Sequence, residues 1–151
     1  VAGANILHIS SPSLLDDTSA MSSFVGLAAA PGKQNEGFMQ AREIMNLQAT
    51  VDLVVLSGAQ QKSGFSGAGI LGMTWAWFAA GSSSTIFNRW QADPVASNQL
   101  MIDFYSRIKP GTRSPDSKAA ALRQSVLSLR RNPDYQHPYY WASCAMIGDS
   151  R

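Results

Sequence analysis

Short apolar runs alternate along this chain with longer segments of helical periodicity. Residues 51–57 (VDLVVLS) are almost continuously apolar, which is typical of a strand buried on both faces of a sheet. Residues 5–10 (NILHIS) and 85–90 (TIFNRW) predict two further strands, residues 24–29 a weaker one and residues 141–147 a last one. This alternation predicts an α/β fold in which helices cover a mostly parallel sheet.

Four segments between these runs carry the helical pattern. Residues 38–47 predict one helix, and residues 70–80 (ILGMTWAWFAA), apolar almost all round, predict a core helix that ends before Gly81. Two amphipathic helices should begin at Asp93-Pro94 and Ser114-Pro115, because each pair offers an N-cap oxygen and a proline for the first turn. Their apolar stripes, which we assign to the core, are Met101, Phe104, Tyr105 and Ile108, and Ala119, Leu122, Val126 and Leu129.

The composition fits a single soluble domain. The chain has 151 residues, of which 45% are hydrophobic and 15% charged, and no apolar run approaches the roughly 20 residues that a membrane span needs. The single cysteine, Cys144, excludes an internal disulfide or a cysteine metal cluster and is compatible with a cytoplasmic location. Because the chain begins almost inside a strand, we expect residues 1–151 to be an excised portion of a longer domain.

Positive charge is concentrated in the last part of the chain. Residues 101–151 carry eight basic and four acidic groups, although the whole chain has a formal charge of only +2. That charge is too small to indicate nucleic-acid binding. We assign the basic residues of the second amphipathic helix to a solvated face rather than to a polyanion site: Lys118, Arg123, Arg130 and Arg131. Residues 132–140, with two prolines, predict a rigid connection into the last strand.

Ligands of open α/β sheets bind at the carboxyl ends of parallel strands, here residues 10–17 and 58–69. The second segment contains GAGILG (Gly67, Gly69, Gly72), a match to the dinucleotide-binding G-x-G-x-x-G, and Asp93 follows 21 residues later. A dinucleotide site needs its first glycine directly after the strand, however, and nine residues intervene. We therefore favour glycines that allow close helix packing and keep a dinucleotide-binding domain as an alternative. Residues 64–68 (GFSGA) lack the last glycine of a nucleophile elbow.

Several segments together resemble the CHAT domain, a family of caspase-like cysteine peptidases related to separase. They are VDLVVLSGAQ, GILGMTWAWFAAG, NRWQAD, QLMIDFYSRI, AAALRQSVLSLRRNPDY and HPYYWASCAMIGD, with AREIMNL preceding the central strand. The resemblance covers most of the chain and implies a caspase-like three-layer sandwich. It also implies that residues 1–151 form the C-terminal core of such a domain, that helical repeats accompany it on the full chain, and that no cofactor is used.

The resemblance also implies where catalysis would occur. The family's Leu-Ser-Ala-Cys falls on residues 56–59, so that Ala59 occupies the position of the nucleophilic cysteine. The family's Leu-His-x-Ala-Thr-His-Gly falls on residues 7–13, so that Pro12 occupies the position of the histidine base. Neither side chain can perform covalent catalysis. Gly58, and Ala68 in place of a glutamate, also depart from the family pattern, which indicates drift of the whole pocket.

The resulting hypothesis is a pseudopeptidase that binds a peptide or a partner protein. Its vestigial cleft would comprise Ser10, Ser11, Ser57, Gly58 and Gln60. The alternative is an active caspase-like peptidase or altered hydrolase, in which Ser57 or Ser11 replaces the cysteine and an imidazole lies within hydrogen-bond reach.

Other candidate groups are assigned structural roles. His8, which lies inside its predicted strand, is expected to be a hydrogen-bonded structural residue. Cys144 is expected to be a small buried hydrophobe, and His137 to hold the C-terminal signature loop against the sheet. Two histidines far apart in the sequence do not indicate a metal site. An open sheet edge near Val1 would allow self-association.

Overall fold

The computed structural model describes residues 4–29, 37–61, 67–108 and 117–150. The strands are β1 (Ile6–Ile9), β2 (Ser13–Leu15), β3 (Phe24–Gly26), β4 (Phe38–Gln40), β5 (Leu53–Leu56), β6 (Ala59–Gln61), β7 (Ser84–Asn88) and β8 (Cys144–Gly148). The α-helices are α1 (Ala41–Ile44), α2 (Ala68–Ala79), α3 (Pro94–Arg107), α4 (Lys118–Arg131) and α5 (Pro138–Trp141), and the 3-10 helices are η1 (Ala20–Ser22) and η2 (Pro133–Tyr135).

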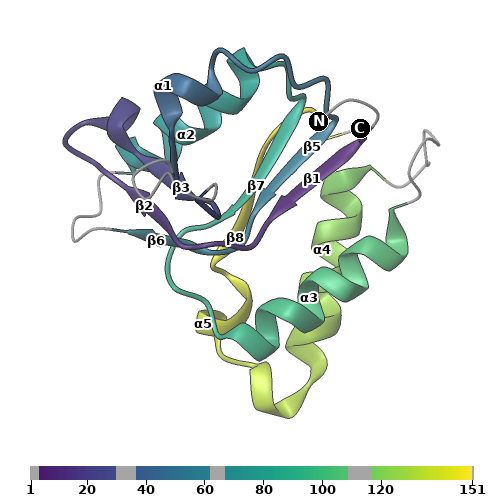
Figure 1. Ribbon diagram of the computed structural model, residues 1–151. Helices are drawn as coiled ribbons and strands as arrows, with labels where there is room; N and C mark the ends of the chain where they lie inside the picture. The colour runs from purple at the N-terminus through teal and green to yellow at the C-terminus, as the bar shows by residue number, and fades with distance from the viewer. Residues whose placement is uncertain (1–3, 30–36, 62–66, 109–116, 151) are drawn as a thin grey trace.

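The main sheet has the strand order β1-β5-β7-β8. Strands β1, β5 and β7 are parallel and β8 is antiparallel to β7, which confirms the prediction of a mostly parallel sheet. Each predicted strand is present, with ends that differ from the expected ones by a few residues. Figure 1 shows α1 and α2 on one side of this sheet and α3 and α4 on the other.

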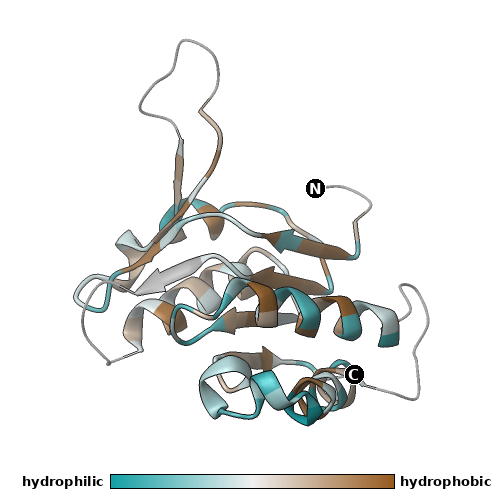
Figure 2. Cartoon of the chain, turned by 90° about the horizontal axis from the view of Figure 1, so that it is seen from below, coloured by the Kyte–Doolittle hydropathy of each residue, from teal (hydrophilic) through white to brown (hydrophobic). Residues whose placement is uncertain are grey.

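The central strand β5 explains this arrangement, because its four residues are all buried and alternate between two cores. Val54 and Leu56 belong to the core beneath α1 and α2, and Leu53 and Val55 to the core beneath α3 and α4. A strand with two apolar faces is stable only between two layers of helix. Figure 2 shows apolar and polar segments alternating along the amphipathic helices, whereas α2 is apolar along nearly its whole length.

Helices α3 and α4 follow their predicted stripes closely. Every residue of the first stripe packs into the second core, as do three residues of the second stripe. Ala119 is the exception, since it is partly exposed near the start of α4. Lys118 was expected on a solvated face, but it is only 7% exposed and its Nζ lies 2.9 Å from Asp52 Oδ1. The lysine therefore ties α4 to the start of β5.

A second, smaller sheet was not predicted. Its order is β4-β3-β2-β6, and β2 pairs antiparallel with β3 and parallel with β6. Leu15 and Val25 from this sheet enter the core beneath α2. Its strands have three residues each. Only β3 was predicted, as the weaker strand expected at residues 24–29, whereas β2, β4 and β6 contain too little alternation to be recognised as strands.

Two predicted elements are wrong at their N-terminal ends. Residues 38–40 belong to β4 rather than to a helix, because they pair with β3. Helix α1 begins after Gln40, whose N–H donates to Glu43 Oε2 at 2.7 Å. Trp141 belongs to α5 rather than to the last strand, because Pro138 and the His137 side chain, which accepts from Tyr139 N–H, start a helical turn there.

The start of α3 is confirmed and that of α4 is corrected. Asp93 caps α3 by accepting a hydrogen bond from Ala96 N–H at 2.9 Å, and Pro94 occupies the first turn. Helix α4 is capped by Ser117, which accepts from Ala120 N–H. Ser114 and Pro115 lie outside the described residues.

Helix α2 ends as predicted at Gly81, which has a φ of +108°. Gly81 N–H bonds to Phe78 O and Ser82 N–H to Trp77 O, the pair of bonds that closes a Schellman motif. The prediction of a core helix is confirmed, since Ile70, Met73, Ala76 and Trp77 lie in the core, although its outer side is exposed at Trp75 (66%) and Leu71 (51%). Among the helices of the described segments, none combines the length and apolar character that crossing a bilayer demands.

Candidate functional site

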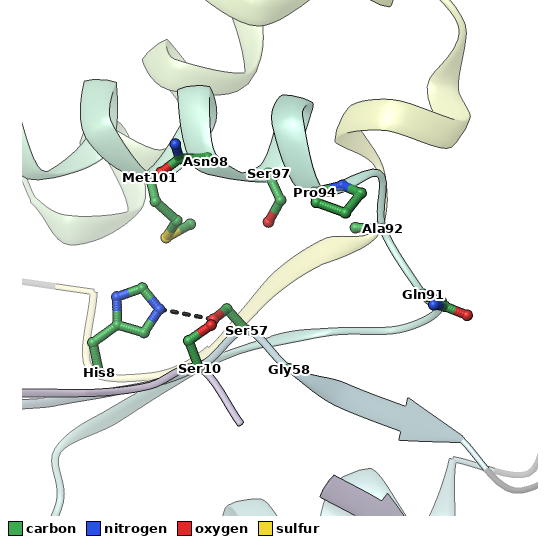
Figure 3. Close-up of a pocket in the computed structure, with 10 residues that line it drawn as sticks. All are labelled: His8, Ser10, Ser57, Gly58, Gln91, Ala92, Pro94, Ser97, Asn98 and Met101. Carbon is green, nitrogen blue, oxygen red and sulfur yellow. Dashed lines mark hydrogen bonds between the residues drawn. The ribbon is translucent and has the colours of Figure 1, made fainter. Parts of the chain in front are cut away.

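A cavity of about 460 Å³ opens where β1 and β5 end and α3 begins. Figure 3 shows residues of the strand ends on one side of it and residues of α3 on the other. The lining residues are His8, Ser10, Ser57, Gly58, Gln91, Ala92, Pro94, Ser97, Asn98 and Met101. The cavity thus lies at the sheet edge where α/β proteins bind ligands.

A chain of hydrogen bonds runs along one wall of this pocket. His8 Nε2 lies 2.9 Å from Ser57 Oγ, and His8 Nδ1 lies 2.9 Å from the hydroxyl of Tyr105 on α3. The parallel register of β1 and β5, which aligns His8 with Val55, places the imidazole and the Ser57 side chain on the same face. The structure therefore supplies the imidazole beside a hydroxyl that an altered hydrolase would require.

The protonation of this chain determines what it can do. Partial burial lowers the pKa of His8 from 6.5, so the ring is neutral above that pH. Burial raises the pKa of Tyr105 to about 12, so its phenol keeps its proton. An imidazole nitrogen accepts a hydrogen bond better than a phenol oxygen, and we therefore assign Tyr105 as donor to Nδ1 and Nε2–H as donor to Ser57. In this order the imidazole presents no lone pair to Ser57.

The backbone at the end of β5 is held in place. Ser57 N–H donates to Ile9 O at 3.0 Å, and Asn88 Nδ2 at the end of β7 donates to Ser57 O at 3.0 Å. Three neighbouring strands thus fix the position of Ser57.

Beyond Ser57 the chain leaves the main sheet and enters the small one. Ser13 of β2 pairs with Ala59 of β6 in parallel register, so that Pro12 and Ala59, which the resemblance assigns to the base and the nucleophile positions, lie on adjacent backbones. Pro12 O accepts a hydrogen bond from Gly26 N–H at 2.7 Å. A Cβ on Gly58 would lie 2.1 Å from Ser11 O. Glycine is therefore required where the two crossing segments meet.

The structure divides the predicted cleft residues. Ser10, Ser57 and Gly58 line the pocket. The hydroxyl of Ser11 instead donates to Gly26 O in the small sheet. Gln60 lies in β6, and its side chain is outside the described residues.

The α3 side of the pocket was missed by sequence reasoning. Pro94, Ser97, Asn98 and Met101 contribute to the lining from the first two turns of this helix. The Asp93-Pro94 start signal placed the helix N-terminus correctly. The signal does not show that the N-terminus of α3 lies over the ends of β1 and β5, because that position depends on the fold.

Two glycines of GAGILG, Gly69 and Gly72, serve helix packing as expected, whereas a Cβ on Gly67 would meet no heavy atom within 4 Å. A Cβ on Gly69 would approach Leu15 and Asp16 backbone atoms within 2.8–3.1 Å, and one on Gly72 would lie 2.6 Å from Ala20 Cβ. Gly69 N–H donates to Asp17 Oδ1 at 2.9 Å. A side chain of the protein therefore occupies the helix terminus that would bind a pyrophosphate. Asp93 caps α3, and residues 64–66 of the elbow-like segment lie outside the described residues.

Cys144 and the loop after His137 lie in surroundings that favour a structural role. Burial raises the pKa of the Cys144 thiol to about 12, which disfavours the reactive thiolate. The loop that follows His137 is held by Trp90 Nε1, which donates to Tyr139 O at 3.1 Å. In the described portions of the chain, no three His, Cys, Asp or Glu side chains gather in a way that could hold a metal ion.

Comparison with known proteins adds the family context. The profile of the CHAT domain matches residues 2–149. Tetratricopeptide repeat protein 28 of Homo sapiens is 29% identical over 114 residues, which cover 75% of this chain and 4% of that protein. Its counterpart of the same name from Mus musculus is 28% identical over the same length, with the same coverage. The chain therefore spans a small fraction of the length of these curated relatives.

Proposed function

We propose that this chain, which belongs to the CHAT domain family, is a caspase-like pseudopeptidase that binds a polypeptide segment without cleaving it by cysteine chemistry. The observation that carries the proposal is the pairing of Ser13 with Ala59. It sets Pro12 and Ala59 next to one another, as a catalytic pair would require, while neither side chain can serve as thiolate or imidazole.

Two features support retention of binding. The pocket at the ends of β1 and β5 is open and lined by hydroxyl and amide groups. Strand β6 forms one edge of the small sheet among the described residues, and an extended peptide can add to such an edge through main-chain hydrogen bonds. Loss of a thiol removes neither feature.

The experiment that tests this proposal restores the missing pair. We compare four proteins that all carry Cys144→Ser: one without further change, the variants Ala59→Cys and Pro12→His, and the variant with both substitutions. Each is treated with a peptidyl acyloxymethyl ketone, which labels activated thiolates. We expect no labelling of the protein that keeps Ala59 and Pro12, and fastest labelling of the double variant. Binding of fluorescent peptide libraries to the wild-type protein is measured in parallel by anisotropy. Peptide turnover by the wild-type protein would contradict the proposal.

A second candidate, a serine-dependent hydrolase, is favoured by the 2.9 Å distance between His8 Nε2 and Ser57 Oγ. It requires the opposite tautomer, in which Nδ1–H donates to Tyr105 and Nε2 accepts the serine proton. A fluorophosphonate probe separates the two functions. Labelling that disappears in both Ser57→Ala and His8→Gln would support the hydrolase, and an unlabelled wild-type protein would support the pseudopeptidase.

We further propose that helical repeats on the full-length chain accompany this domain. The two relatives carry tetratricopeptide repeats in their names, and they extend far beyond the matched segment. Helical repeats present concave surfaces that bind extended partners. A repeat-bound partner would then be held near the pocket at a high effective concentration.

A further inference from the structure

The lining of the pocket carries no formal charge at neutral pH, because His8 is neutral and the other nine residues are serine, glycine, glutamine, alanine, proline, asparagine or methionine. The nearest acidic residue in the sequence, Asp93, accepts a hydrogen bond from Ala96 N–H at 2.9 Å and so offsets the positive end of α3. A carboxylate or ammonium group entering this pocket would lose water without gaining an opposite charge. Such an exchange is costly.

The same lining has unused capacity for neutral hydrogen bonds. The side chains of Ser10, Ser97 and Asn98 form no hydrogen bond within the described part of the chain, and Ser57, which receives a bond from His8, still has its own proton to donate. Figure 3 shows Ser97 extending from α3 toward the space above Ser10 and Ser57. Donors and acceptors are therefore available on both walls.

The apolar part of the lining complements these groups. Met101 extends from α3 toward His8 (Figure 3), and Ala92 and Pro94 lie at the other end of the cavity. A ligand that fits has a short apolar stem and a polar, uncharged end with both donors and acceptors. Among protein side chains, a carboxamide has this character, since it offers two N–H donors and a carbonyl acceptor.

We propose that this pocket is a specificity site that accepts the side chain of a glutamine or asparagine from an extended peptide and rejects the charged side chains. The inference rests on the proposed peptide-binding function and names its ligand class. Hydroxyl side chains would bind more weakly than carboxamides, because they can satisfy fewer of the free groups.

The test compares peptides that differ by little except charge. Fluorescent hexapeptide sublibraries are prepared with one fixed position occupied by Gln, Glu or Lys and the other positions mixed. Glu is nearly isosteric with Gln, so a difference between them reports charge rather than size. We expect the Gln sublibrary to bind about tenfold more tightly than either charged one at neutral pH.

A substitution in the pocket should change this preference in a predictable way. Ser97→Asp adds a carboxylate to the wall and should shift the preference from Gln to Lys. The matched control is Ser106→Asp at the other end of α3, an exposed serine outside the pocket that bonds to Asp103 O. The control should keep the wild-type preference.

The possible outcomes distinguish peptide binding from the preference of the pocket for a carboxamide side chain. If no sublibrary binds, the proposed peptide-binding function is wrong. If the sublibraries bind but Glu or Lys equals Gln, or if Ser97→Asp leaves the preference unchanged, the specificity inference is overturned while peptide binding stands. A Gln preference that becomes a Lys preference only in the Ser97→Asp variant supports both.

Discussion

The ends of β1 and β5 show two regions that differ sharply over a few residues. On the α3 side, His8 and Ser57 are hydrogen-bonded to each other and line an open pocket. On the side of the small sheet lie Pro12 and Ala59, which we propose to occupy the positions of the family's catalytic pair and whose backbones are adjacent. Strand pairing therefore brings side chains of β1 and β5 together on the pocket side and the backbones of β2 and β6 together on the other, and only the pocket side carries an imidazole beside a hydroxyl.

The difference teaches that backbone geometry and catalytic chemistry are separable in this fold. The crossing of Ser11 over Gly58 and the pairing of Ser13 with Ala59 hold the two strand ends together through main-chain contacts. Such contacts do not depend on the side chains at positions 12 and 59. Under the proposed function, a peptide-binding shape would thus be kept without a thiol or an imidazole at these two positions.

The largest expected effect comes from Gly58→Ala. The added Cβ would lie 2.1 Å from Ser11 O, a backbone atom that cannot move without displacing β2. We expect a loss of about 3 kcal/mol in the free energy of unfolding, measured by urea titration. The substitution would then destabilise the whole domain rather than either region alone.

Gly67→Ala is the control for this prediction. Gly67 has a φ of +74°, and a Cβ there would meet no heavy atom within 4 Å. The cost should be the conformational one alone, about 1 kcal/mol. Equal losses in the two variants would show that the contact with Ser11 is not what demands glycine at position 58.

The main sheet could be predicted from the sequence because its information is local. In β5 four consecutive apolar residues are all buried, and the shortness of the run and its two β-branched valines favour a central strand over a buried helix. Of the small sheet only β3 was predicted, since each strand has three residues and β2 pairs with β6 from a distant part of the chain. At residues 38–40 pairing with β3 therefore prevailed over helical periodicity.

The candidate site also combines features that the sequence indicates with contacts that only the fold creates. The positions of Pro12 and Ala59 came from a resemblance, and the register of β2 and β6 places their backbones side by side. The contact of Tyr105 with His8 could not be anticipated, because it joins residues 97 positions apart. Tyr105 appeared in the sequence only as one member of an apolar stripe. Its hydroxyl acquires a partner only once α3 lies on the sheet.

A moderate effect is expected from Tyr105→Phe, which removes the donor to His8 Nδ1 but keeps the packing of the ring. The lost hydrogen bond should cost about 1 kcal/mol in the free energy of unfolding. Tyr135→Phe is the matched control, because the Tyr135 hydroxyl forms no hydrogen bond in the described residues, and it should be neutral. An unchanged free energy of unfolding in Tyr105→Phe would show that the hydrogen bond between Tyr105 and His8 contributes nothing to stability. The pocket region and the small-sheet region would then not differ in their contribution to stability.

The smallest expected effect is a pH dependence that belongs to the pocket side alone. Burial lowers the pKa of His8 in the folded protein relative to about 6.5 in the unfolded chain, so the unfolded state binds more protons in this range. The contribution of neutral His8 to the free energy of unfolding is therefore fully present above pH 6.5 and is lost as the pH falls through the folded-state pKa. The groups facing the ring are the hydroxyls of Tyr105 and Ser57, which can accept from the protonated ring but carry no negative charge to offset its desolvation.

Urea titrations at pH 7.5 and 5.5 measure this contribution when the wild-type protein is compared with His8→Gln. The wild-type protein should lose more stability between the two pH values than the variant does. Asp103, whose pKa is lowered mainly by a hydrogen bond from Arg107, contributes only below about pH 3.8 and so does not enter this window. An equal loss in both proteins would place the acid sensitivity elsewhere. The opposite difference, a variant more acid-sensitive than the wild-type protein, would mean that protonated His8 is stabilised in the pocket, and the assignment of an uncharged lining would then be wrong below neutral pH.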